Sequence, residues 1–127
     1  MIVDPTNPVG PDGKGGFQKL IGEQESSGQI LAGLLPAGAQ LVKAFGTLSA
    51  GTLAASARRE PDRAVQFYAA DDAAAGDLVA DLIRAGGYEP VRVGGLDQAI
   101  RIEAFGDLHE LGGLGRTVTR AEALQAI

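Results

Sequence analysis

Short apolar runs separated by helix-like segments constrain the fold of this chain more than any other feature of its sequence. The runs at residues 41–45, 65–69 and 89–93 have the length of strands, and residues 1–3 supply the end of another. The segments between them carry apolar residues at helical spacing and end at Gly or Pro. Strands that alternate with helices indicate a mostly parallel sheet with flanking helices, so we predict an α/β fold.

Cap and stop residues place the first two helices. Ser26 and Ser27 precede a short helix that Pro36 ends. Thr47 or Ser49 can cap the second helix, because either hydroxyl can accept a hydrogen bond from a backbone amide in the first turn.

The third helix has the most regular pattern. Asp71 can cap it, and Gly86-Gly87 stops it. Its apolar positions recur every three or four residues, as in an amphipathic helix. They are Ala74, Leu78, Leu82 and Ala85, with Val79 and Ile83 widening the stripe.

A chain of 127 residues is enough for one domain with a core, so we predict a single domain over residues 1–127. Residues 8–25 are rich in Gly and Pro and are predicted to form a long loop. Residues 94–127 are predicted to be an irregular tail, broken by Gly106, Gly112, Gly113 and Gly115. In this tail Thr119 is predicted to cap a terminal helix over residues 120–127.

Composition excludes several classes of function. A formal charge of −5 with 11 scattered basic residues disfavours nucleic-acid binding. Zero cysteines exclude disulfides and thiolate chemistry, and no apolar run is long enough to cross a bilayer. The start of the sequence has no basic region followed by an apolar core, so we expect a soluble cytoplasmic protein without membrane contact.

Eight short blocks carry a resemblance to a known family. They are residues 3–8 (VDPTNP), 26–27 (SS), 35–36 (LP), 42–48 (VKAFGTL), 69–73 (AADDA), 87–91 (GYEPV), 94–96 (GGL) and 117–124 (TVTRAEAL). In order and spacing they resemble the NADP oxidoreductases related to the deazaflavin (coenzyme F-420)-dependent NADP reductases, and specifically their C-terminal half.

The resemblance implies the second half of a Rossmann-like dinucleotide-binding fold. It also implies hydride transfer between NADP(H) and a deazaflavin or other small acceptor, with NADP as the cofactor and coenzyme F-420 as its partner. No catalytic side chain and no metal are implied, because the cofactor carries the chemistry and the protein orients the two rings. The implied cofactor-binding residues are Thr6, Asn7, Pro8, Phe45, Gly46 and Thr47.

Two departures from the family limit what the resemblance implies. The sequence lacks the Gly-x-Gly-x-x-Gly turn of the front half, which would hold the pyrophosphate at a helix N-terminus. Gly46 stands where relatives usually carry Asn or His, so it can act only through its backbone. We therefore leave open whether the chain alone is an enzyme. The alternatives are a non-catalytic interaction module, paired in a homo-oligomer or with a complementary chain, and a truncated fragment.

Individual motifs also have plainer interpretations. Asn7-Pro8 is an ordinary turn sequence, and Thr47 can cap a helix. The glycines around Lys14 lack the spacing of a phosphate loop, so a flexible loop is favoured. Asp71-Asp72 is explained by helix capping. His109, the only histidine, has no evident second ligand, so we expect it at the surface.

Overall fold

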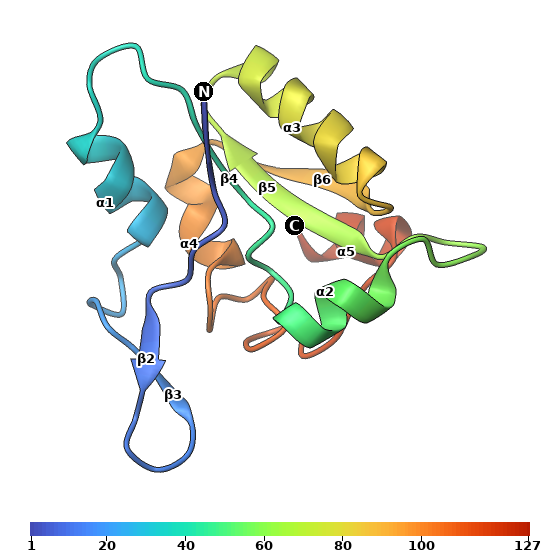
Figure 1. Ribbon diagram of the computed structural model, residues 1–127, viewed down its shortest axis with the longest axis horizontal. Coiled ribbons are helices and arrows are strands. Elements are labelled where there is room, and N and C mark those ends of the chain that lie inside the picture. Colours follow the sequence, from blue (N-terminus) through green and yellow to red (C-terminus); the bar gives the residue numbers. More distant parts are fainter.

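A four-stranded sheet with helices on both faces forms the body of the molecule. The computed structural model describes residues 1–127, and Figure 1 shows the strands crossing its centre. The sheet has the order β1-β4-β5-β6. Its strands are β1 (Ile2–Asp4), β4 (Leu41–Ala44), β5 (Val65–Ala70) and β6 (Glu89–Gly94). The α/β class predicted from the alternation is confirmed.

Strand direction divides this sheet into two halves. β1 runs parallel to β4 and β5 runs parallel to β6, whereas β4 and β5 are antiparallel. The sheet is therefore mostly parallel, as predicted, with one antiparallel pairing that the sequence did not indicate. As a result, the C-terminal ends of β1 and β4 lie at one end of the sheet, along the strand direction, and those of β5 and β6 lie at the opposite end.

Side chains of β5 point alternately to the two faces of the sheet and pack into two separate hydrophobic cores. Val65 and Phe67 point to one face, beneath α4 (Ala99–Ile102) and α5 (Arg120–Ala126). Tyr68 points to the other face, beneath α2 (Ala50–Ser56) and α3 (Ala73–Ala85). Every residue of β5 is buried, which explains its continuous apolar run. The longest helix, α3, has 13 residues, and none of the helices has the length and apolarity needed to traverse a bilayer.

Three of the predicted caps are present. Ser26 caps α1 (Ser27–Leu34), and Ser49, one of the two candidates, caps α2. Thr119 and Glu122 form a reciprocal capping box at the start of α5.

The predicted cap of α3 is wrong by one residue. Asp72, not Asp71, accepts from the backbone amide of Ala75, at 2.8 Å. The Asp71 carboxylate instead accepts from the amide of Leu96, also at 2.8 Å. Asp71 therefore joins the start of α3 to the 3-10 turn η1 (Leu96–Gln98).

The apolar positions that predicted α3 are split between its two sides. Val79 and Ile83 are fully buried, but Leu78 and Leu82 are 60% and 53% exposed. The buried face is completed by the small residues Ala75, Gly76 and Ala80. The helix is thus correctly predicted, whereas its two leucines face solvent.

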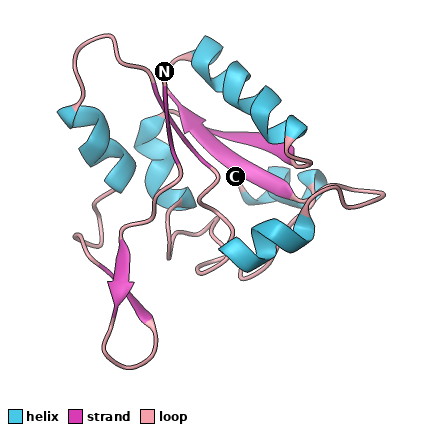
Figure 2. Cartoon of the chain, viewed as in Figure 1, coloured by secondary structure: helices cyan, strands magenta, loops and turns pink.

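The Gly/Pro-rich segment predicted as a loop contains a β-hairpin. Its strands are β2 (Val9–Pro11) and β3 (Phe17–Lys19), and Figure 2 shows it projecting away from the body. Asp12 shapes the turn, because its carboxylate accepts from the amides of Lys14 and Gly16 at 2.7 and 3.0 Å. Gly13 and Gly15 supply the left-handed backbone positions of this turn, at φ 77° and 86°.

Candidate functional site

The loop after β1 is shaped by the carboxylate that ends the strand. The Asp4 Oδ1 atom accepts from the Thr6 amide at 2.9 Å and from the Thr6 hydroxyl at 2.6 Å. This local turn directs the chain toward the C-terminal end of β4. The side chain of Thr6 is therefore occupied by its own loop.

Three segments distant in sequence meet at the carbonyl oxygen of Gly46. Asn7 Nδ2 donates to this oxygen at 2.9 Å, and His109 Nε2 contacts it at 2.7 Å. The amide of Ala104 donates to Asn7 Oδ1 at 2.8 Å. We call Asn7, Gly46, Ala104 and His109 the Gly46 junction.

Glycine at position 46 permits the close approach of the two loops. A Cβ atom there would lie 3.0 Å from the carbonyl oxygen of Pro5 and 3.4 Å from Asn7 Nδ2. Because a backbone oxygen cannot move aside as a flexible side chain can, a larger residue would push the loop after β1 away from β4.

His109 is buried, so its predicted surface position is wrong. Only 2% of it is exposed. The amide of Leu111 donates to Nδ1 at 2.9 Å, which leaves Nε2 to carry the proton donated to Gly46. Burial lowers the pKa of His109, and the hydrogen bond to the Gly46 carbonyl raises it only partly back. The imidazole is thus a neutral positioning group for the junction.

A buried lysine lies beneath the loop after β1. Lys43 Nζ donates to Asp4 Oδ2 at 2.9 Å, to the carbonyl of Thr6 at 2.6 Å and to Ser27 Oγ at 3.1 Å. Burial raises the pKa of Asp4, but hydrogen bonds from Thr6 and Lys43 outweigh this effect and leave the pKa below its ordinary value. Lys43 thus fixes the end of β1 against the start of α1.

A second buried carboxylate completes this polar cluster. Glu103 accepts from the Ser26 hydroxyl at 2.6 Å and from the amides of Ser27 and Gly28 at 2.7 and 3.1 Å. Its Oε2 atom lies 4.0 Å from Lys43 Nζ. Sequence reasoning missed both Lys43 and Glu103. For Lys43 the available signal was a charged residue inside an otherwise apolar strand.

The other predicted site residues point in different directions. The Thr47 hydroxyl donates to Gln66 Oε1 at 3.2 Å in the core. Phe45 is half-buried, with a left-handed backbone at φ 66°. The carbonyl of Pro8 accepts from the Leu20 amide at 2.8 Å and so closes the base of the hairpin. Among the six residues, a hydrogen bond between side chain and backbone joins Asn7 and Gly46 directly.

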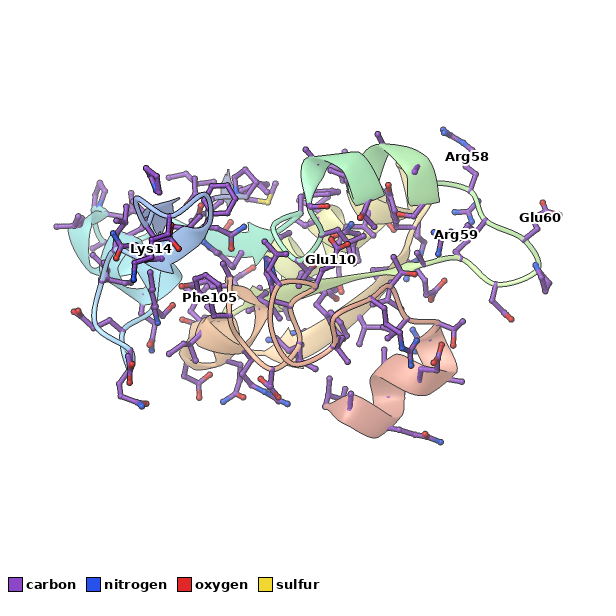
Figure 3. All side chains as sticks on the ribbon, turned by 90° about the horizontal axis from the view of Figure 1, so that it is seen from below. Lys14, Arg58, Arg59, Glu60, Phe105 and Glu110 are labelled. Carbon is purple, nitrogen blue, oxygen red and sulfur yellow. The ribbon has the colours of Figure 1, made fainter.

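The largest cavity lies beside the junction rather than within it. It measures about 510 Å³, and none of the six predicted residues lines it. Phe105, which directly follows Ala104 of the junction, forms part of its wall. Figure 3 shows Phe105 between the hairpin that carries Lys14 and the segment that carries Glu110. The structure contains no group of three or more His, Asp or Glu side chains placed to hold a metal ion.

Comparisons with known proteins give structural relatives only. No protein-family model and no curated protein matches the chain. A crystal structure of a hypothetical protein from Sinorhizobium meliloti is similar over 93% of this chain, with 28% identity and a TM-score of 0.76. A crystal structure from Arthrobacter sp. FB24, described provisionally as an F-420-dependent NADP reductase, is similar over 77% of this chain, with 24% identity and a TM-score of 0.65.

The chain spans about half the length of these two proteins, 54% of the first and 44% of the second. The likeness at 24% identity establishes a shared fold with the Arthrobacter protein. The relative at 28% identity carries no described activity.

Proposed function

We propose that this chain belongs to the NADP-dependent oxidoreductases and takes part in hydride transfer between NADP(H) and a deazaflavin or other small acceptor. The fold shared with the protein described as an F-420-dependent NADP reductase supports this proposal. The resemblance of the eight sequence blocks to the same family supports it separately, because that resemblance depends on residue identities and not on the fold.

The observation that carries the proposal is the position of the Gly46 junction. It joins the loops that follow β1 and β4, two neighbouring parallel strands. Open α/β sheets bind ligands outside the C-terminal ends of their parallel strands. A cofactor at this edge would meet the exposed Thr6 and the half-buried Asn7, Pro8 and Phe45, with Gly46 and Thr47 supporting them from beneath.

Such a site suits hydride transfer better than acid-base or nucleophilic chemistry. The His109 ring is fully engaged and buried, and Lys43 is bonded to three oxygen atoms. Neither side chain is free to attack a substrate or to exchange a proton with one. Hydride transfer requires only that the protein hold two rings in contact, and the nicotinamide itself would supply the hydride.

Calorimetric titration with NADPH and NADP tests this proposal. The informative variant is Asn7→Asp, which keeps the acceptor for Ala104 but loses the amide donor to Gly46. We expect micromolar binding by the unmodified chain and at least about tenfold weaker binding by the variant, because the loop loses its fixed position. Gln18→Glu, an equivalent exchange on the exposed hairpin, is the control. No binding up to about 1 mM, or equal binding by both variants, would contradict the proposal.

A second candidate is an interaction module, which the free edge of β1 favours. β1 pairs only with β4, so its other edge carries unpaired backbone groups. Met1 and Ile2 are 59% and 38% exposed. An unpaired strand edge with apolar side chains is a template for pairing with another chain.

The molecular mass in solution tests this second candidate. We expect a dimer, or a complex with a complementary chain, that Ile2→Lys disrupts, because a charge on an edge strand opposes pairing. Leu124→Lys, at an exposed position of α5, is the matched control. Light scattering that finds a monomer at every concentration, with no complex formed, would exclude the module.

A further inference from the structure

One irregular segment near the C-terminus contacts both loops of the junction and the starts of two helices. It covers residues 103–113, which form no helix or strand, and we call it the clasp. Figure 1 shows it, in orange, between the hairpin and α2. The clasp supplies Ala104 and His109 to the junction, and the amide of Glu110 donates to the carbonyl of Thr47 at 3.0 Å. It therefore holds the loop after β1 and the loop after β4 at the same time.

The two glutamates of the clasp bind the starts of α1 and α2. Glu103 accepts from the first amides of α1, as described above. Glu110 accepts from the amide of Ser49 and from the hydroxyl of Thr52, both at 2.6 Å, and Figure 3 shows it beside α2. Neither helix has an acidic residue in its own first turn, whereas α5 has Glu122 there. Because a carboxylate stabilises a helix N-terminus, α1 and α2 depend on the clasp for this stabilisation.

Backbone hydrogen bonds connect the two ends of the clasp to each other. The amide of Phe105 donates to the carbonyl of Leu111 at 3.1 Å, and the amide of Gly113 donates to the carbonyl of Gly106 at 3.0 Å. The turns pack so closely that a Cβ atom at Gly112 would overlap the carbonyl oxygen of Gly106. Opening one end of the clasp therefore breaks bonds at the other.

We propose that the clasp opens and closes as one unit, and that it orders or releases the loops after β1 and β4 together. Segments joined by many shared contacts open cooperatively, so that one free energy of opening applies to all their amides. Glu110 is a positioning residue of this device, because it acts through α2 and Thr47. A ligand at the C-terminal ends of β1 and β4 would select the closed clasp, and this consequence rests on the proposed function.

Hydrogen exchange of Glu110→Ala, followed by NMR at single amides, tests the proposal in the free chain. The variant removes the carboxylate, and the Glu110 side chain is only partly buried, so both hydrophobic cores remain intact. Two amides report the two loops. They are the amide at position 110, which is bonded to Thr47, and that of Ala104, which is bonded to Asn7. We expect both to exchange faster by a similar factor, about tenfold or more, with β5 unchanged.

Glu122→Ala is the matched control, because it removes a carboxylate from the start of α5, a helix of seven residues like α2. It should leave exchange in the clasp unchanged. Faster exchange at position 110 alone, or at neither amide, would overturn the proposal, because the contacts of the clasp would then be independent. An equal increase in β5 would also overturn it, because Glu110 would then support the whole fold.

NADPH separates the clasp from the proposed function. A ligand that binds only the closed form reduces opening by a factor of one plus its concentration divided by its Kd, which is about tenfold at ten times Kd. We expect this slowing at Ala104 and at position 110 of the unmodified chain. Absence of NADPH binding would remove the reductase role, and the exchange pattern of the free chain would still decide whether the clasp opens as a unit. NADPH binding without slower exchange would overturn the link between the clasp and the site.

Discussion

The neutral form of the His109 imidazole holds the Gly46 junction together, so the contribution of this junction to stability depends on pH. Its pKa lies below the ordinary 6.5 because burial disfavours the imidazolium, and a proton added to Nδ1 would confront the amide of Leu111. In the unfolded chain the same ring takes up its proton near 6.5. Between these two pKa values the unfolded state binds more protons, so folding stability falls as the pH falls.

We therefore expect the free energy of unfolding to decrease from about pH 7.5 to about pH 5.5, by up to about 1.4 kcal/mol per unit below the unfolded pKa. Urea denaturation at the two pH values measures this. His109→Gln should be less stable at the higher pH and should lose most of the slope.

The chain has no other histidine. In Asp4 and Glu110, hydrogen bonds outweigh the effect of burial and lower the pKa from 3.8 and 4.5, so their contributions are lost only in more acidic solution. An unchanged slope in His109→Gln would contradict this role for the histidine.

At the scale of elements, the face of α3 that packs into the core is not the face that carries Leu78 and Leu82. Ile83 is fully buried, whereas Leu82, its neighbour in sequence, is 53% exposed. We expect Ile83→Ala to cost about 2–5 kcal/mol, because it leaves a cavity in the core. Leu82→Ala should cost less than about 1 kcal/mol. Urea denaturation of the two variants checks this pair, and equal losses would mean that the helix is rotated from the position described.

Elements defined by local chemistry were predictable, and contacts across the chain were not. A helix cap depends on residues within three positions, so Ser26, Ser49 and Thr119 could be identified from sequence alone. The antiparallel pairing of β4 with β5 could not. The segment at residues 45–64 is long enough to return the chain in either direction.

The candidate site, like the fold, could be predicted from the sequence only in part. Asn7 and Gly46 follow strands, and the family resemblance pointed to both. His109 and Glu103 were not identified because each acts through partners far along the chain. His109 bonds to Gly46, and Glu103 bonds to the start of α1. No local pattern of residues encodes such contacts.

For the whole molecule, the hairpin and the sheet should differ in how readily they open. The hairpin has strands of three residues, and Phe17 and Leu20 are 63% and 64% exposed. β5 lies between the two hydrophobic cores. We expect amide hydrogens of the hairpin to exchange at a low free energy of opening and those of β5 only on global unfolding. Hydrogen exchange followed by mass spectrometry measures both, and equal protection would show that the hairpin is an integral part of the body.

The single antiparallel pairing gives the sheet two chemically separate ends. One end carries the loops that contain Asn7 and Gly46, and the other carries Asp71 at the C-terminal end of β5. Energetic effects of distant substitutions that share no partner usually add. Changes made at the Asp71 end should therefore combine additively with changes at the Gly46 junction. Either end of the protein could then be altered, by selection or by design, without readjusting the other.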